Sequence, residues 1–143
     1  MSQKGWTVNP DSGGVKIPDS VKHNVEKHIQ VFAKEHFNGN YLRIDLRFRG
    51  QFCYIDAFRE SMTQDYGMLP PGWKENRDGY MDRRRNTPTH LCRLRYFGDE
   101  GSWGFAFFTY SKEKYELSMF PTGKFFGSPE EAFEVSANVY LRD

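Results

Sequence analysis

The sequence predicts a two-layer α+β domain, in which a five-stranded antiparallel meander sheet is packed by N- and C-terminal helices. Apolar residues recur at helical spacing near both ends of the chain, and they alternate with polar residues in the segments between. The length of 143 residues suits one domain, because domains commonly run to about 100–150 residues. An aromatic content of 17% supplies a core and excludes a disordered chain.

The first helix is expected to begin after Pro18, with Asp19 or Ser20 as its cap. Asn38-Gly39-Asn40 is expected to end it, since glycine commonly follows the last turn of a helix. Residues 1–18 are rich in Gly, Ser, Asn and Pro and predict a flexible arm, which leaves residues 19–143 as the domain. The predicted core stripe of the helix consists of Val21, Val25, Ile29, Phe32, Ala33 and Phe37.

Residues 41–58 predict a β-hairpin. The segment 41–49 alternates strictly, Gly50-Gln51 suits a two-residue turn, and the segment 52–58 returns. Placing Arg49 opposite Phe52 puts all the aliphatic side chains of the first strand on the core face. The same register places Asp45 directly opposite Asp56 on the outer face, where two carboxylates repel unless arginines, a proton or a cation neutralise them.

The second half of the chain predicts three more strands and a helix. A long inserted segment, residues 60–90, is expected to contain a short helix near 76–86. Strands are expected at 90–97, 103–110 and 114–120, and a capping box at Ser128 with Pro129 begins the last helix. Placing Phe97 opposite Trp103 puts Ala106 and Phe108 in the core and Phe105 and Phe107 outside, where Arg95 and Arg93 would stack on them.

The predicted outer face combines arginine, aromatic and carboxylate side chains. Arginine interleaved with aromatic rings is how some sheets bind single-stranded nucleic acid, because bases stack on the rings and phosphates pair with the guanidinium groups. We therefore expect a non-enzymatic binding module that takes an anionic ligand, a nucleic acid or a nucleotide. The expected ligand-binding residues are Arg43, Asp45, Arg47, Tyr54, Asp56, Arg93, Arg95 and Phe105.

The charge distribution agrees with an anion-binding surface but not with duplex DNA. Ten of the eleven arginines lie between residues 41 and 95. Arginine is favoured where planar contacts with anions matter. The formal net charge is only +1, however, which argues against a protein that holds duplex DNA by charge alone.

Two alternatives remain open at this point. The same face could bury its aromatic side chains in a homodimer or another protein partner, in which case Phe105→Asp makes a monomer. It could also belong to a small phosphodiester hydrolase in which His90 is the base and Asp45 or Asp56 orients it, although no catalytic motif is present. Binding alone predicts that Arg47→Ala weakens the ligand with little loss of stability.

No metal or cofactor is expected. Cys53 and Cys92 do not form a CxxC pair, and with His90 they make an incomplete zinc ligand set, so we interpret them as buried thiols. The N-terminus shows no apolar signal region, and no run approaches the ~18 apolar residues of a membrane span. A cytoplasmic location without membrane attachment is therefore expected.

Three segments resemble a family of small uncharacterised bacterial proteins. They are residues 43–56 (RIDLRFRGQFCYID), 86–97 (NTPTHLCRLRYF) and 128–133 (SPEEAF). The resemblance covers most of residues 41–141 and implies a bacterial, cytosolic setting. It implies no activity and assigns no functional residues.

Overall fold

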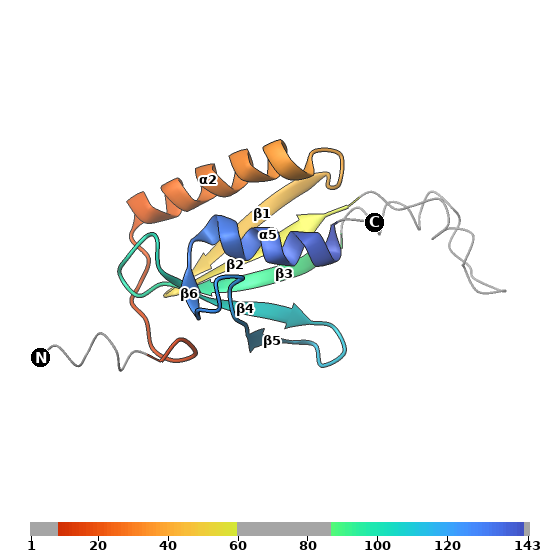
Figure 1. The fold of residues 1–143 in the computed structure, drawn as a ribbon. Coiled ribbons are helices and arrows are strands. Elements are labelled where there is room, and N and C mark those ends of the chain that lie inside the picture. The colour runs from red at the N-terminus through yellow and green to blue at the C-terminus, as the bar shows by residue number, and fades with distance from the viewer. Residues whose placement is uncertain (1–8, 60–86, 142–143) are drawn as a thin grey trace, which may run out of the picture.

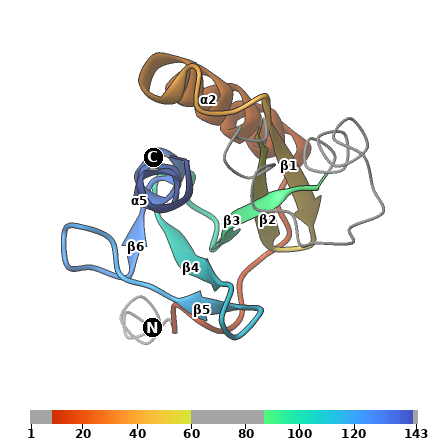
Figure 2. The same ribbon diagram turned by 90° about the vertical axis from the view of Figure 1, so that its right-hand side faces the viewer.

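The strands form one antiparallel sheet, and both helices lie on the same face of it (Figures 1 and 2). The computed structural model describes residues 9–59 and 87–141. The strand order is β1-β2-β3-β4-β5, with β6 paired to β4, so the predicted α+β fold with its meander is confirmed. The elements are α2 (Asp19–Phe37), β1 (Arg43–Arg49), β2 (Phe52–Phe58), β3 (Thr89–Arg95), β4 (Trp103–Thr109), β5 (Lys114–Leu117), β6 (Phe126–Gly127) and α5 (Pro129–Tyr140).

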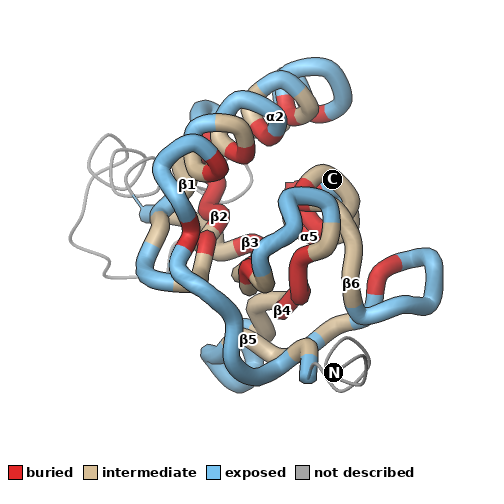
Figure 3. Tube along the Cα trace, turned by 90° about the vertical axis from the view of Figure 1, so that its left-hand side faces the viewer, coloured by how far each residue is buried: buried red, intermediate tan, exposed pale blue. Residues whose placement is uncertain are grey.

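Helix α2 turns its apolar stripe toward the sheet, and Figure 3 shows the buried residues along that side. The stripe matches the prediction except for Phe32, which is partly buried at its edge. The predicted cap was wrong. Pro18 is the N-cap, no side chain caps the helix, and Asp19 instead pairs with Lys22 at 3.5 Å. At the other end Gly39 adopts the expected left-handed conformation, with φ of +89°.

Helix α5 begins as predicted. The Ser128 hydroxyl accepts a hydrogen bond from the Glu131 backbone N–H at 3.2 Å, and the Glu131 carboxylate accepts one from the Ser128 N–H at 2.9 Å. Pro129 occupies the first turn, where a missing N–H costs nothing. The apolar side of α5 packs on β3, β4 and α2, with Ala132, Phe133 and Ala137 buried.

The β1–β2 hairpin has the predicted register at every position. Gly50 opens the two-residue turn with φ of +59°, a conformation that favours glycine. Asp45 therefore lies opposite Asp56, and Arg47 lies opposite Tyr54. The hairpin is the part of the sheet on which most of the predicted site residues lie.

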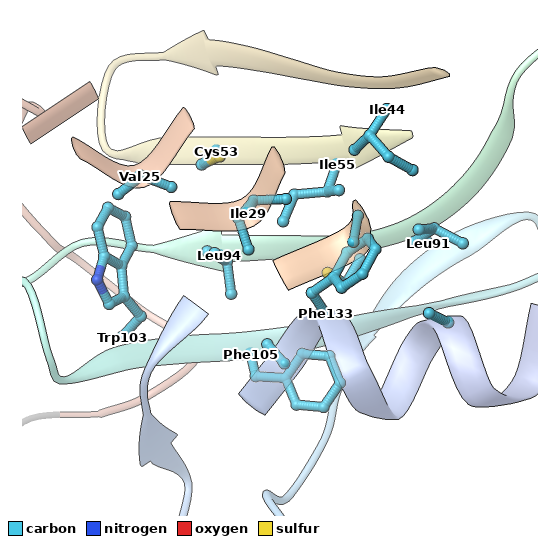
Figure 4. Close-up of a cluster of buried hydrophobic side chains, with 14 of the residues drawn as sticks. Val25, Ile29, Ile44, Cys53, Ile55, Leu91, Leu94, Trp103, Phe105 and Phe133 are labelled. Carbon is cyan, nitrogen blue, oxygen red and sulfur yellow. The ribbon is translucent and has the colours of Figure 1, made fainter. Parts of the chain in front are cut away.

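The predicted faces of β4 were wrong. Leu94 pairs with Phe105 rather than with Ala106, a shift of one residue that exchanges the two faces of the strand. Trp103 and Phe105 are fully buried between the sheet and the helices, as Figure 4 shows, and Phe107 packs against the same core. Large rings fill the space under the helices better than Gly104 and Ala106 could, so the larger set faces inward.

The described part of the N-terminal arm lies against the sheet. Val15 donates a backbone hydrogen bond to Tyr96 at 2.9 Å and Ile17 donates one to Gly50 at 3.0 Å. The arm crosses the outer face beside Gly104, where an added Cβ would lie only 2.8 Å from the carbonyl oxygen of Pro10. The small residues of β4 therefore make room for the arm.

The remaining differences from the prediction are the end of one strand and one additional short strand. Strand β5 stops at Leu117 rather than at residue 120, and the two-residue strand β6 was not predicted. The short helix expected near 76–86 lies outside the described residues. Within the described ranges no helix is both long and apolar enough to cross a bilayer.

Candidate functional site

The face of the sheet turned away from α2 and α5, called here the outer face, holds most of the predicted site residues. They are positioned by strand alternation, because every second side chain of β1, β2 and β3 points to this side. The outer-face side chains near the predicted site are Arg43, Asp45, Arg47, Tyr54, Asp56, His90, Arg93, Arg95, Phe108 and Tyr115.

The opposed carboxylates Asp45 and Asp56 are each neutralised by an arginine of β1. Arg43 Nε donates to Asp45 Oδ1 at 3.1 Å, and Arg47 Nε donates to Asp56 Oδ2 at 3.1 Å. The two carboxylates differ in burial, since 42% of the Asp45 side chain is exposed but only 6% of that of Asp56. Arginines, a proton and a cation were the three possible ways to neutralise the opposed carboxylates, and the structure shows arginines.

A β-bulge brings His90 to the outer face. Residues 52–55 of β2 pair with residues 92–95 of β3 in a regular register, which then shifts so that Asp56 lies opposite His90 and Leu91 has no partner. A regular strand would place Leu91 opposite Asp56, and His90 opposite Ala57 on the core face. The bulge instead buries Leu91 completely and turns His90 outward.

Asp56 and His90 form a hydrogen-bonded pair. His90 Nδ1 lies 2.8 Å from Asp56 Oδ1, so the two oxygens of this buried carboxylate hold an imidazole and the Arg47 guanidinium. The hydrogen bond between them is consistent with the prediction that Asp56 orients His90. Asp45, the other predicted orienter, pairs with Arg43 instead.

Aromatic residues of β4 and β5 surround the imidazole. The His90 ring centroid lies 4.9 Å from that of Phe108 and 6.5 Å from that of Tyr115. The Tyr110 hydroxyl accepts a hydrogen bond from the His90 backbone N–H at 2.7 Å. Burial, together with the nearby Asp56 carboxylate, raises the pKa of Tyr115, so its hydroxyl stays protonated.

Sequence reasoning missed Phe108, Tyr110 and Tyr115 as neighbours of this site. A correct β4 register would have placed Phe108 on the outer face, and the β4–β5 pairing would then have placed Tyr115 opposite it. The alternating large and small side chains of residues 103–106 were the signal for that register.

The side chains of Arg93 and Arg95 contact other residues of this chain. Both guanidinium groups stack over Phe52, at 4.5 and 4.6 Å from its centroid, and not over β4 as predicted. Arg95 donates to the Gly13 carbonyl of the arm at 2.7 Å, and Arg93 Nη2 lies 3.9 Å from Asp11.

The side chain of Arg93 is only 19% exposed, and its buried Nε has no hydrogen-bond partner among the described residues. Burial, and the adjacent charge of Arg93, lower the pKa of Arg95.

Phe105 does not belong to the site. It is 1% exposed and contacts Phe120 in the core, so the proposed stacking role is corrected. Tyr54 lies where it was expected, under the Arg47 guanidinium at 4.8 Å and 5.5 Å from Tyr115.

The described residues include no group of three metal-binding side chains. Cys53 and Cys92 are free and fully buried. Burial raises the pKa of both thiols, that of Cys92 to about 12, so neither has thiolate character at neutral pH.

The chain matches no protein-family model, and no curated protein or solved structure is significantly similar to it. Its class therefore follows from fold and site alone. It is an α+β domain with an arginine, aspartate and histidine cluster on the outer face of an antiparallel sheet.

Proposed function

We propose that the outer face binds an anionic ligand made of phosphate and aromatic base, a single-stranded nucleic acid or a nucleotide. The main support is the arrangement of Arg43 and Arg47. Each guanidinium bonds its aspartate through Nε and stacks over an aromatic ring, at 3.9 Å for Arg43 and 4.8 Å for Arg47. The side chains are 58% and 56% exposed, so their terminal nitrogens remain accessible to phosphate oxygens.

Charge on this face favours an anion. Among the described residues, Arg43, Arg47, Arg49, Arg93 and Arg95 lie on it, against three aspartates, Asp11, Asp45 and Asp56. The surplus is local, because the chain as a whole has a formal charge of only +1. A short single strand or a nucleotide suits a small cationic surface of this kind better than a long duplex does.

Tyr54 and Tyr115 supply surfaces on which bases can stack. Their rings contact each other at 5.5 Å, and both side chains are partly exposed between the arginines. Stacking on an aromatic side chain is worth about 1–3 kcal/mol per base and requires no particular sequence. The combination favours a ligand that has both phosphate and base.

The alternative of homodimerisation through this face loses its main argument. It rested on exposed rings at residues 103–107, and Trp103 and Phe105 lie in the core. The oligomeric state is nevertheless worth measuring in the same experiment.

The test is a binding titration of a fluorescent single-stranded oligonucleotide at several salt concentrations. We expect Arg43→Ala to weaken binding and to reduce the slope of log K against log salt by about 0.7, the contribution of one phosphate contact on a single strand. Lys34→Ala is the matched control, because it removes one exposed positive charge from α2 on the opposite face. It is expected to leave the slope unchanged.

Three outcomes separate the hypotheses. Equal effects of the two variants, or no binding at low salt, would contradict the proposal and leave the arginine–aspartate pairs a purely structural role. Competition by a mononucleotide would indicate that one nucleotide fills the site, whereas competition by the oligonucleotide alone would indicate an extended strand. A dimer by light scattering that the ligand does not affect would favour an interaction surface instead.

A further inference from the structure

The Asp56–His90 pair has the arrangement of a proton-transfer centre. Asp56 accepts at 2.8 Å from one ring nitrogen of His90, which leaves Nε2 as the nitrogen that can meet a ligand. A carboxylate that holds Nδ1–H fixes the tautomer and the ring orientation, so Nε2 presents its lone pair. About a third of the His90 side chain is exposed, whereas Asp56 is shielded from water.

Neutralisation of the Asp56 charge does not explain the contact with His90. Arg47 already neutralises Asp56, so the carboxylate does not need a second cationic partner for its charge. The ring reaches Asp56 only because a bulge at Leu91 interrupts the β2–β3 ladder and reverses the side to which His90 points. Bulges are frequent next to active sites, where they aim a side chain that a regular strand would point elsewhere.

The cluster also joins a base to an anion-binding group. Arg47 and His90 bond to the two oxygens of the same carboxylate, so a phosphate bound by the terminal nitrogens of Arg47 would lie in the same cluster as the imidazole. A base next to a bound phosphodiester can act on a neighbouring hydroxyl. In single-stranded RNA every phosphodiester has such a hydroxyl, the ribose 2′-OH, directly beside it.

We propose that this site cleaves single-stranded RNA, with His90 as the general base and Arg47 as the group that holds the phosphate. The proposal rests on the binding function above and adds a reaction to it. His90 Nε2 takes the proton of the 2′-hydroxyl, O2′ forms a bond to phosphorus, and the bond from phosphorus to O5′ breaks.

Water completes the proton balance of this reaction. The departing O5′ takes a proton from water, and the resulting hydroxide takes the proton held by His90. The products are a 2′,3′-cyclic phosphate and a 5′-hydroxyl. No oxidant, reductant or co-substrate is needed, and Asp56 is a positioning residue that acts through His90.

The experiment compares three oligonucleotides of one sequence: RNA, DNA, and RNA methylated at every 2′-oxygen. We expect the full-length protein to cleave only the unmodified RNA and to leave 2′,3′-cyclic phosphate ends, which mass spectrometry identifies. His90→Gln is expected to lower the cleavage rate by at least about 100-fold, the usual contribution of a general base. The affinity for the methylated RNA should change by no more than about twofold.

His23→Gln is the matched control, because His23 is exposed on α2, which lies on the opposite face of the sheet. It is purified in the same way and is expected to cleave like the wild type, which excludes a contaminating nuclease as the cause of any difference. If His90→Gln does not fold, the comparison of the three oligonucleotides with the wild-type protein still tests the reaction.

The outcomes also separate this proposal from the binding function. Binding of the methylated RNA without cleavage of the unmodified RNA overturns the reaction and leaves the binding function in place. Cleavage that survives His90→Gln, or cleavage of DNA at a similar rate, also overturns it. Absence of binding to any of the three oligonucleotides contradicts both proposals.

Discussion

Arg47→Ala and Arg43→Ala make a matched pair that tests how burial of a carboxylate sets the value of its ion pair. Both arginines lie on β1, donate through Nε at 3.1 Å and stack on an aromatic ring of β2. The main difference is the partner, since the Asp56 side chain is 6% exposed and that of Asp45 is 42% exposed. Any difference in stability between the variants therefore reports mainly on the buried carboxylate.

The expected magnitudes follow from that difference. Removing one hydrogen-bond partner from a buried polar group costs about 1–3 kcal/mol, whereas an exposed pair is worth about 0–1 kcal/mol. Asp56 keeps its bond to His90, so we expect Arg47→Ala to lower the free energy of unfolding by about 2 kcal/mol. This revises the small loss of stability expected from the sequence, because Arg47 pairs with a buried carboxylate. Arg43→Ala should lower the free energy of unfolding by less than about 1 kcal/mol.

Urea denaturation followed by circular dichroism measures both values, with m required to stay constant. For a domain of this size 1 kcal/mol corresponds to roughly 4 °C in Tm, so Arg47→Ala should melt about 8 °C lower. Adding Asp56→Asn to Arg47→Ala should recover part of the loss, because the buried charge is then removed. Equal losses for the two arginine variants, or a larger loss for Arg43→Ala, would refute the reasoning.

Three further predictions test the packing. Phe105→Ala should cost about 3–5 kcal/mol in chemical denaturation, and Phe105→Asp should fail to fold rather than yield a folded monomer, because the ring is in the core. Gly104→Val should displace the arm next to Pro10 and speed limited proteolysis before residue 17, whereas a valine tolerated without change would contradict the close approach. Cys53 and Cys92, whose pKa values are raised by burial, should resist iodoacetamide in the native protein at mildly alkaline pH and react in guanidinium chloride, as mass spectrometry will show.

The β1–β2 hairpin could be predicted completely because its turn fixes its register. A two-residue turn with glycine at its first position leaves one pairing of the flanking strands, and alternation then assigns every side chain to a face. The register placed Asp45 opposite Asp56 with Arg43 and Arg47 on the same face, but it left arginines, a proton and a cation as possible ways to neutralise the carboxylates. Local sequence was sufficient here because the contacts that matter lie within sixteen residues of one another, between Arg43 and Phe58.

The β3–β4 register could not be fixed in the same way. The connection, residues 96–102, is long enough to allow several pairings, and a slip of one residue exchanges the faces of a strand. Tertiary contacts decide between these pairings. The space under α2 and α5 takes Trp103 and Phe105, and the arm needs Gly104 beneath it. The helices and the arm are distant from β4 in sequence, so a local sequence pattern does not predict their contacts with it.

The position of His90 depends on a bulge that balances two demands. Leu91 and Cys92 are adjacent in sequence and both belong to the hydrophobic core under the helices, whereas neighbouring side chains of a regular strand point to opposite faces. One unpaired residue resolves the conflict, and every residue before it is then turned to the other side. The burial of Leu91 thus holds His90 against Asp56, so core packing on one face of the sheet sets the geometry of the candidate site on the other. The sequence signal for this arrangement is a pair of consecutive apolar residues, Leu91 and Cys92, inside an alternating strand. This signal can be interpreted only when the strand that pairs with β3 is known.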